Sequence, residues 1–285
     1  MTEKNKTREA TLYLVATPIG NLADLSDRAR KVLAEVSFVA AEDTRNTRGL
    51  LSHFDIHREL VSYHEHNKAE AGPRIVSRLL AGESCALVTD AGMPAVSDPG
   101  EDLVRLAAEA GITVTCVPGG TAAVTALACS ALPTGRFVFE GFLPTDKKEK
   151  AARLTALAAE ERTAILYEAP HRLKRTLGEL AAALGAERPL TVARELTKLN
   201  EEFLRTTVGG AVAHYETVEP RGEYVLVLGG AEKKKTAPDW EMLTPREHVA
   251  AYEGEGLSRM DAIKAAARDR GVSKSVLYGL LQKEE

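Results

Sequence analysis

The sequence contains few of the features that mark secreted, metal-stabilised or membrane-spanning proteins. Its three cysteines, Cys85, Cys116 and Cys129, lack C-x-x-C spacing and lie in apolar stretches, so we predict packed thiols rather than disulfides or structural zinc. No apolar run is long enough to span a bilayer. The polar N-terminus also lacks the apolar region of a secretory signal, so we expect a soluble, cytoplasmic protein.

Two common nucleotide-binding motifs are absent as well. The first loop, ATPIGNLADLS, lacks the G-x-G-x-x-G spacing of a dinucleotide site, and no G-x-x-x-x-G-K-[ST] occurs in the chain. The 37 Lys and Arg residues against 41 Asp and Glu residues give a net charge of -4. Proteins that grip long nucleic acid non-specifically usually carry a basic surplus, whereas a local basic cleft is compatible with these totals.

Apolar runs alternate with helix-length segments along most of the chain, which predicts β-α units and a largely parallel sheet. Five such units end near residue 132. Beyond it, EFLRTT follows LTVAREL after a short polar connection, so antiparallel neighbours are expected there. The predicted divisions are a flexible N-terminus (1–11), an N-terminal α/β domain (12–132), a C-terminal α/β domain (133–230), a linker (231–240) and a helical domain (241–285).

The C-terminal segment shows three short helical patterns after the charged, proline-containing stretch AEKKKTAPDW. Ser258 and Ser273 precede two of these patterns and are predicted N-caps. The arrangement is similar to a helix-turn-helix unit. Two roles fit equally well, namely contact with RNA and a helical appendage that packs on the body or mediates dimer contacts.

The stretch TDAGMPAVSDPG, residues 89–100, connects a predicted strand to a helix with unusually many special residues. Ligands of open parallel sheets collect at such strand ends. Gly92 permits a positive φ or close approach of a ligand, and Ser97 or Asp98 can cap a helix that Pro99 opens at its first position. Asp90 has no helix to cap, so its carboxylate suits a ligand with positive charge or hydroxyl groups.

The stretch CVPGGTAAVTAL forms a second unusual strand end. Two glycines and Thr121 at a helix start offer unpaired N–H groups, which suit a carboxylate or phosphate, although small residues also serve close helix–sheet packing. The recurrence of such loops at neighbouring strand ends favours a ligand site over packing alone.

Several stretches, in order from about Leu12 to Gly230, closely resemble the bacterial small-subunit rRNA ribose methyltransferases of the tetrapyrrole methylase superfamily. The stretches that carry the resemblance include LYLVATPIGNLADLSDRA, FVAAEDTRNTRGLL, SYHEHN, VTDAGMPAVSDPG, VPGGTAAVTALACSALP, FVFEGFLP, LYEAPHRL and ARELTKLNEE. The resemblance implies an α/β fold with two α/β domains of the tetrapyrrole methylase type, a cofactor cleft between them and a C-terminal helix-turn-helix-like extension.

The same resemblance implies S-adenosylmethionine as methyl donor, a homodimer, and the ribose 2′-hydroxyl of a cytidine in the decoding region of small-subunit (16S) rRNA as substrate. The first loop differs from the glycine-rich, acidic loop of porphyrin-type members. A tetrapyrrole-like substrate and a non-catalytic ribosome-binding factor remain alternatives. The cofactor-binding residues that the resemblance implies are Pro18, Asp90, Gly92, Val96, Ser97, Asp98, Gly119, Thr121, Ala122, Glu168, Ala169, Tyr224 and Val225.

Transfer of a methyl group to a ribose hydroxyl calls for a base that removes the hydroxyl proton. Candidate bases are Glu42, Asp43, His64, His66, Glu168 and Glu195. Asp43 with Arg45 is preferred because a carboxylate and a guanidinium follow a strand end directly, although the pair also fits an N-cap with an exposed arginine. Glu168 is the third catalytic candidate.

Cationic and imidazole side chains in loops and first helical turns predict a basic rim for the phosphates of RNA. The predicted RNA-binding residues are Arg48, His64, His66, Arg136, Lys147, Lys148, His171, Arg172, Arg194 and Lys198. His64 and His66 alternate onto one strand face, but no third ligand follows at a recognisable spacing, so no metal is expected.

Overall fold

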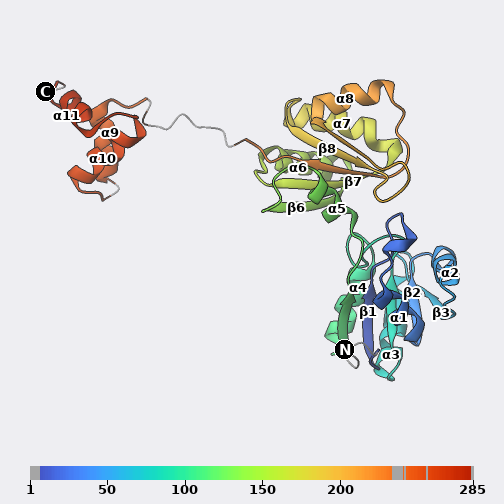
Figure 1. The fold of residues 1–285 in the computed structure, drawn as a ribbon. Coiled ribbons are helices and arrows are strands. Elements are labelled where there is room, and N and C mark those ends of the chain that lie inside the picture. The colour runs from blue at the N-terminus through green and yellow to red at the C-terminus, as the bar shows by residue number, and fades with distance from the viewer. Residues whose placement is uncertain (1–6, 233–239, 241, 255, 284–285) are drawn as a thin grey trace. The chain divides into compact units, whose positions relative to one another are not determined.

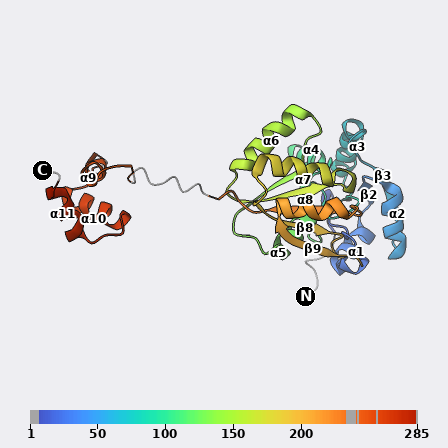
Figure 2. The same cartoon turned by 90° about the horizontal axis from the view of Figure 1, so that it is seen from above.

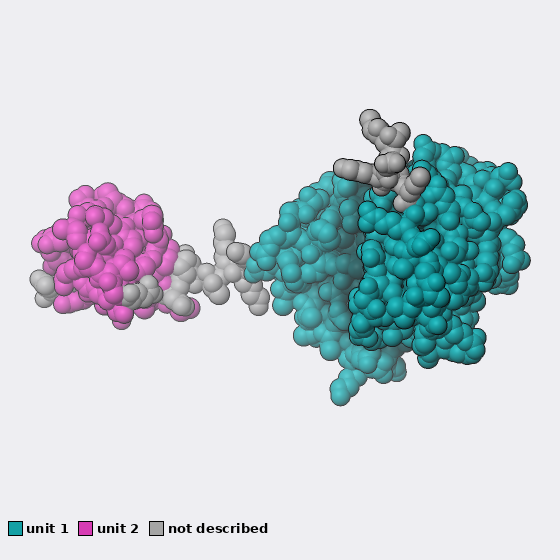
Figure 3. Space-filling view, turned by 90° about the horizontal axis from the view of Figure 1, so that it is seen from below, with its two compact units in different colours: residues 1–231 teal, residues 232–285 magenta. Residues whose placement is uncertain are grey.

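The computed structural model describes residues 7–232, 240, 242–254 and 256–283. The chain divides into two compact units, residues 1–231 and 232–285 (Figure 3). Both predicted α/β domains fall in the first unit and the predicted helical domain falls in the second. Residues 1–6 of the predicted N-terminal segment and 233–239 of the predicted linker lie outside the described residues.

The first sheet of unit 1 is wholly parallel, as the alternating pattern predicts (Figure 1). Its strands are β1 (Thr11–Val15), β2 (Phe38–Ala41), β3 (Glu59–Ser62), β4 (Cys85–Val88) and β5 (Thr113–Val117), in the order β3-β2-β4-β1-β5. Helices α1 (Asp27–Glu35) and α2 (Thr44–His53) share one apolar core with this sheet, and α3 (Lys68–Leu80) and α4 (Gly100–Glu109) share the other. A 3-10 helix, η1 (Leu22–Asp24), lies between β1 and α1.

The second sheet is mixed. Its strands are β6 (Phe137–Phe142), β7 (Thr163–Glu168), β8 (Pro189–Arg194), β9 (Glu202–Thr207) and β10 (Tyr224–Leu228), in the order β6-β7-β10-β8-β9. The pair β6–β7 is parallel and the other three pairs are antiparallel, so the predicted antiparallel pairing of EFLRTT with LTVAREL is confirmed. One core lies between this sheet and α6 (Lys147–Ala159), α7 (Pro170–Leu184) and α8 (Val208–Thr217). Figure 2, seen from above, shows these three helices next to one another.

Helix α5 (Ala122–Cys129) follows β5 of the first sheet but packs against the second sheet. Ala126 and Leu127 lie in one apolar cluster with Val225 of β10. The sequence predicted this helix as the end of the fifth unit of the N-terminal domain. Alternating strands and helices reveal order along the chain, but they do not reveal which sheet a helix of small residues approaches.

Local capping explains where several helices begin. Side chains of Ser26, Asp43, Asp146 and Thr207 accept hydrogen bonds from the first turns of α1, α2, α6 and α8. The predicted start of α4 needs a small correction, because the helix begins at Gly100 and Pro99 occupies the N-cap position. The carboxylate of Asp98 still serves this turn, since Oδ1 accepts from the Gly100 N–H at 2.7 Å.

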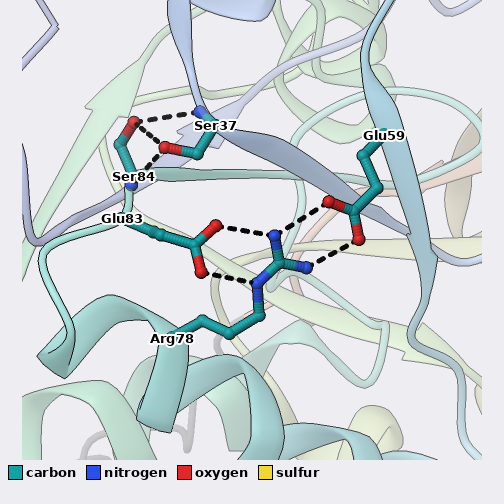
Figure 4. A network of polar contacts seen from close by, with 5 residues as sticks. All are labelled: Ser37, Glu59, Arg78, Glu83 and Ser84. Carbon is teal, nitrogen blue, oxygen red and sulfur yellow. Dashed lines mark hydrogen bonds and ion pairs between the residues drawn. The ribbon is translucent and has the colours of Figure 1, made fainter.

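A polar network ties the first sheet together near the amino ends of its strands (Figure 4). Arg78 of α3 donates to both carboxylate oxygens of Glu59 at 2.8 and 2.9 Å and to those of Glu83 at 2.9 and 2.6 Å. Its guanidinium carbon also lies 3.7 Å from the centroid of the Phe38 ring. The network therefore stabilises the end of the sheet opposite the strand-end loops.

Unit 2 contains the three predicted helices, α9 (Pro245–Gly254), α10 (Arg259–Asp269) and α11 (Lys274–Lys283). They enclose a small core that includes Val249, Ile263 and Leu277. The Ser258 hydroxyl accepts from the Asp261 N–H at the start of α10, and the Ser273 hydroxyl accepts from the Val276 N–H, so both predicted caps are confirmed. Among the described residues, no helix is long and apolar enough to cross a membrane.

Candidate active site: a strand-end cleft and an adjoining recess

Loops at the strand ends of both sheets of unit 1 line a cavity of about 360 Å³, which we call the strand-end cleft. It receives residues that follow β2, β4, β5 and β7 and residues at the start of β10. The lining consists of Ile19, Glu42, Thr89, Ala91, Gly92, Met93, Val96, Ser97, Asp98, Thr121, Ala122, Phe142, Tyr167, Glu168, Ala169, Pro170, Leu196, Glu223, Tyr224 and Val225.

Backbone and side-chain hydrogen bonds fix the conformation of residues 89–98. Gly92, at φ +90, exchanges backbone hydrogen bonds of 2.9 and 3.1 Å with Thr17. Ala95 and Ser97 adopt φ angles of 66° and 63°, which side-chain-bearing residues rarely adopt. The conformation is stabilised by Asp98, whose Oδ1 accepts from the Ala95 and Gly100 N–H groups at 2.9 and 2.7 Å.

The second sheet contributes a loop with similar strain. Glu195 and Thr197 adopt φ angles of 50° and 64°, and Leu196 between them lines the cleft. A Cβ on Gly141, in the bulge of β6, would lie 3.0 Å from the Ser97 hydroxyl oxygen, so the glycine permits close approach of the two loops. Strained backbone of this kind concentrates at binding and catalytic sites.

The charged groups of the cleft are all acidic. Of the described residues that line it, Glu42, Asp98, Glu168 and Glu223 are acidic and none is lysine, arginine or histidine. Glu168 pairs with Arg172 at 3.3 Å, and Glu223 pairs with Lys198 at 3.0 Å. The cleft therefore suits a ligand with net positive charge.

Glu42 and Asp98 differ from the other two acids because their hydrogen bonds come from neutral groups. The Thr89 hydroxyl donates to Glu42 Oε2 at 3.0 Å, and backbone N–H groups donate to Asp98 Oδ1. The second carboxylate oxygen of Asp98, Oδ2, is buried without a hydrogen-bond partner. A buried acceptor left unpaired costs free energy, so a donor supplied by a ligand fits this position.

Aromatic rings form part of the cleft wall. Tyr167 makes edge-to-face contacts with Phe139 and Phe142, with ring centroids 5.1 and 5.6 Å apart. Its hydroxyl accepts from the Ala123 N–H at 3.2 Å, and burial raises its pKa. The neutral rings offer an apolar surface to a flat group of a ligand.

The structure brings together most of the residues that the resemblance assigned to the cofactor. Those in the cleft lining are Gly92, Val96, Ser97, Asp98, Thr121, Ala122, Glu168, Ala169, Tyr224 and Val225. Gly119 does not line the cleft and packs against Ala16, where an added Cβ would lie 2.9 Å from the Ala16 Cβ. The sequence did not identify the aromatic pair Phe142 and Tyr167, whose only signals were their places in the stretches FVFEGFLP and LYEAPHRL.

Pro18 and Asp90 lie in a different cavity of about 540 Å³, which we call the α2 recess. Its lining consists of Thr17, Pro18, Gly20, Leu22, Arg45, Asn46, Thr47, Gly49, Leu50, His53, Thr89 and Asp90. Thr89 lines both cavities. The recess and the strand-end cleft therefore meet at the residue whose hydroxyl donates to Glu42.

The three predicted catalytic residues have different surroundings. Asp43 caps α2 and pairs with Arg45 at 2.8 Å, and these hydrogen bonds lower the Asp43 pKa to about 2. Arg45 is exposed at the edge of the α2 recess. Glu168 is buried, and its oxygens accept from the Ala169 N–H at 2.9 Å and the Thr176 hydroxyl at 2.5 Å.

Comparisons with known proteins identify the family. Residues 11–212 match the family described as Tetrapyrrole (Corrin/Porphyrin) Methylases. A ribosomal RNA small subunit methyltransferase I from Halalkalibacterium halodurans is 48% identical over 278 residues, which cover 97% of this chain and 96% of that protein. The chain belongs to the ribosomal RNA small subunit methyltransferase I family.

A second member of the methyltransferase I family, from Synechocystis, is 47% identical over 269 residues, covering 94% of this chain and 96% of the relative. Among solved structures, a Thermus thermophilus uroporphyrin-III C-methyltransferase complexed with S-adenosylhomocysteine has a TM-score of 0.54 at 22% identity, covering 77% of this chain and 97% of that one. This likeness confirms the predicted tetrapyrrole methylase fold.

Three of the predicted RNA-binding side chains form hydrogen bonds or ion pairs within unit 1. Arg172 donates to the Leu143 carbonyl at 2.8 Å, Arg194 donates to the Arg221 carbonyl at 2.8 Å, and Lys198 pairs with Glu195 at 2.9 Å. The predicted residues with exposed side chains are Arg48, His66, Arg136, Lys147, Lys148 and His171.

His64 and His66 lie near each other, with ring centroids 6.0 Å apart. Nδ1 of the half-buried His64 has no hydrogen-bond partner. The described part of the chain contains no group of three or more His, Cys, Asp or Glu side chains suited to a metal ion.

Proposed function

We propose that this chain transfers a methyl group from S-adenosylmethionine to the ribose 2′-hydroxyl of a cytidine in the decoding region of small-subunit rRNA. The near full-length similarity to proteins named ribosomal RNA small subunit methyltransferase I supports rRNA as substrate. The observation that carries the site assignment is the strand-end cleft, with acidic side chains and no cationic ones among its described lining residues.

The chemistry of the cleft fits this methyl donor. Its sulfonium and ammonium groups outweigh one carboxylate, so an acidic lining attracts it, and the unpaired Asp98 Oδ2 offers an acceptor for one of its donors. The rings of Tyr167 and Phe142 suit the flat adenine. The N–H groups at the start of α5, beside Thr121, suit the carboxylate.

Among the carboxylates, we assign Glu42 as the general base. It lines the cleft, and its described hydrogen bond comes from Thr89, at the junction with the α2 recess. Glu168 is a weaker candidate because both of its oxygens accept hydrogen bonds within the protein. Asp43 is a weaker candidate because a carboxyl with a pKa of about 2 has little affinity for a proton.

When bound, S-adenosylmethionine supplies the methyl group, whose bond to sulfur breaks as its bond to the 2′ oxygen forms. Glu42 takes the hydroxyl proton, and Thr89 orients the glutamate through its hydrogen bond. Alignment of the two reacting groups is expected to supply much of the acceleration.

The test uses small ribosomal subunits from a strain that lacks this gene, incubated with the purified protein and labelled methyl donor. A 2′-O-methyl ribose resists alkaline cleavage, so mass spectrometry after alkaline hydrolysis identifies both the nucleotide and the position of the label. Label at the 2′ oxygen of a decoding-region cytidine is the expected result. Label on a base, or none on RNA, contradicts the proposal.

A tetrapyrrole-like substrate is the alternative that the shared fold suggests. The relatives of near full-length similarity are named rRNA methyltransferases, whereas the likeness to the tetrapyrrole enzyme is one of fold. Incubation with uroporphyrinogen under the same conditions separates the two, because methyl transfer to it is not expected. The two relatives reported above are both named methyltransferases, which gives no support to a non-catalytic ribosome-binding factor.

We further propose that the enzyme works in the cytoplasm, where ribosomal subunits are assembled, and as a homodimer. The second point is what the family resemblance implies, and Leu199, which is 99% exposed, and Val124, which is 52% exposed, are apolar side chains that a partner subunit would shield from water. Light scattering coupled to size-exclusion chromatography is expected to give twice the 30.7 kDa chain mass.

A further inference from the structure

The α2 recess has walls of mixed character that suit a flat, polar heterocycle. Pro18, Leu22 and Leu50 give it an apolar side, and Leu22 is 43% exposed. Asn46 and Asp90 give it a polar side, while Arg45 stands exposed at its edge. A volume of about 540 Å³ lies within the range of small-molecule sites.

Gly49 lies in the interior of α2 and lines this recess. A Cβ added at Gly49 would meet no atom within 4 Å, so the helix surface is open where it faces the recess. A larger side chain at this position would therefore reduce the space in the recess without a clash inside the fold.

Asn46 and Asp90 form a pair at the polar side of the recess, with Asn46 Nδ2 donating to Asp90 Oδ2 at 3.2 Å. The pair presents a carboxylate oxygen, Asp90 Oδ1, beside an amide that has a second N–H to donate. This pattern is complementary to cytosine, whose N4 amine donates and whose ring N3 and O2 accept. Uracil would place its O4 acceptor against the carboxylate.

The position of the recess also matches the chemistry. Thr89 lines both the recess and the strand-end cleft, and its hydroxyl donates to Glu42 at 3.0 Å. A nucleoside with its nucleobase in the recess would have its ribose at this junction, beside Glu42, the proposed general base. Enzymes that modify nucleotides in RNA commonly place an unstacked nucleotide in such a pocket.

We propose that the α2 recess binds the nucleobase of the target nucleotide and that the Asn46–Asp90 pair selects cytosine over uracil. This inference rests on the proposed function. It assigns Pro18 and Asp90 to the substrate rather than to the methyl donor.

Gly49→Leu tests occupancy of the recess, and Gly178→Leu is the matched control. Gly178 is an exposed glycine in the interior of α7, where a Cβ also meets no atom within 4 Å, and it lines none of the described cavities. Both variants are expected to melt at or above the wild-type temperature. Gly49→Leu is expected to lower kcat/KM for small subunits about 100-fold, with binding of the methyl donor unchanged.

A Gly49→Leu variant that methylates as well as the wild type overturns the proposal. A variant that loses affinity for the methyl donor also overturns it, because the recess would then belong to the cofactor site. If the wild-type protein itself fails to methylate ribose, the proposed function fails instead. The two failures are thus distinguished by the wild-type reaction.

Selection by the Asn46–Asp90 pair is tested with Asp90→Asn and subunits that carry cytidine or uridine at the target position. The new carboxamide can donate to O4 of uracil, so the preference for cytidine is expected to fall about 10- to 100-fold. Asp55→Asn, at an exposed position just beyond the C-terminal end of α2, is the control and keeps the wild-type preference. An unchanged preference in Asp90→Asn overturns the assigned selectivity.

Discussion

Glu42 and Asp43 are adjacent in the sequence, yet they occupy different environments. Glu42 lines the strand-end cleft, whereas Asp43 caps α2 and pairs with Arg45. The hydrogen bonds from Arg45 hold the Asp43 pKa at about 2, below the ordinary 3.8. The stabilisation that this ion pair gives the folded protein is therefore fully present above about pH 4 and is lost as the pH falls through about 2. Asp43 therefore stays ionised over the range in which the enzyme works.

Substitution separates the two carboxylates. Glu42→Gln is expected to lower kcat about 100- to 10,000-fold through loss of the base, with the Kd for the methyl donor nearly unchanged. Asp43→Asn is expected to keep near wild-type kcat, because asparagine is an equally good N-cap. Its pH–rate profile should match the wild type. A loss confined to Asp43→Asn would return the role of base to Asp43.

Asp98 holds the strained 89–98 segment through one oxygen and leaves the other buried and unpaired. Asp98→Asn preserves an acceptor for the Ala95 and Gly100 N–H groups but removes the charge. We expect the Kd for S-adenosylmethionine, measured by calorimetry, to rise by about tenfold. Asp102→Asn, which alters an ion-paired carboxylate on α4, is the control. Equal Kd values in wild type and Asp98→Asn would remove Asp98 from the site.

At the scale of elements, the ends of the first sheet serve different purposes. The amino ends of its strands are tied by the Arg78 network, and the carboxyl ends carry the loops of the cleft. Hydrogen bonds from Arg78 lower the pKa of both Glu59 and Glu83. Their contribution to stability is present above the ordinary glutamate pKa of 4.5 and is lost as the pH falls through the lowered values.

Arg78→Met is expected to lower the free energy of unfolding by about 1 to 3 kcal/mol, because paired carboxylates and the contact with the Phe38 ring are lost. Arg74→Met, on the same helix with a single exposed partner in Glu70, is expected to cost under about 0.5 kcal/mol. Urea unfolding at neutral pH measures both. The difference should shrink as the pH falls below 4.5 and the two glutamates become protonated.

The helices and strands follow closely from the sequence because periodicity and caps are local signals. The parallel first sheet, the antiparallel pair β8–β9 and the three helices of unit 2 all lie where the sequence pattern predicts them. The packing partner of α5 does not follow, since it depends on contacts made across the fold. For the same reason Asp90 and Gly92, two residues apart, enter different cavities, which no linear motif distinguishes.

At the scale of the whole molecule, the division at residue 231 allows the role of unit 2 to be tested separately. A chain that ends at residue 231 retains both sheets and every residue of the strand-end cleft. We expect it to bind the methyl donor with wild-type affinity. If unit 2 contacts RNA, affinity for small subunits, measured by sedimentation, falls by about tenfold or more.

An unchanged affinity for subunits would favour the other role, a helical appendage that supports the body or the dimer. The mass of the truncated protein in solution then shows whether unit 2 supports the dimer, because loss of the dimer would give a monomer mass. Sequence alone left these roles equal because a small core such as that of Val249, Ile263 and Leu277 serves any of them.

The acidic lining of the cleft has a consequence for turnover. Methyl transfer converts the sulfonium into an uncharged thioether, so the spent cofactor loses the attraction that drew the fresh one in. Replacement of the demethylated cofactor by S-adenosylmethionine is therefore favoured after each reaction. Inhibitors should follow the same rule, and a nitrogen analogue that keeps a positive centre is expected to compete better than the neutral by-product.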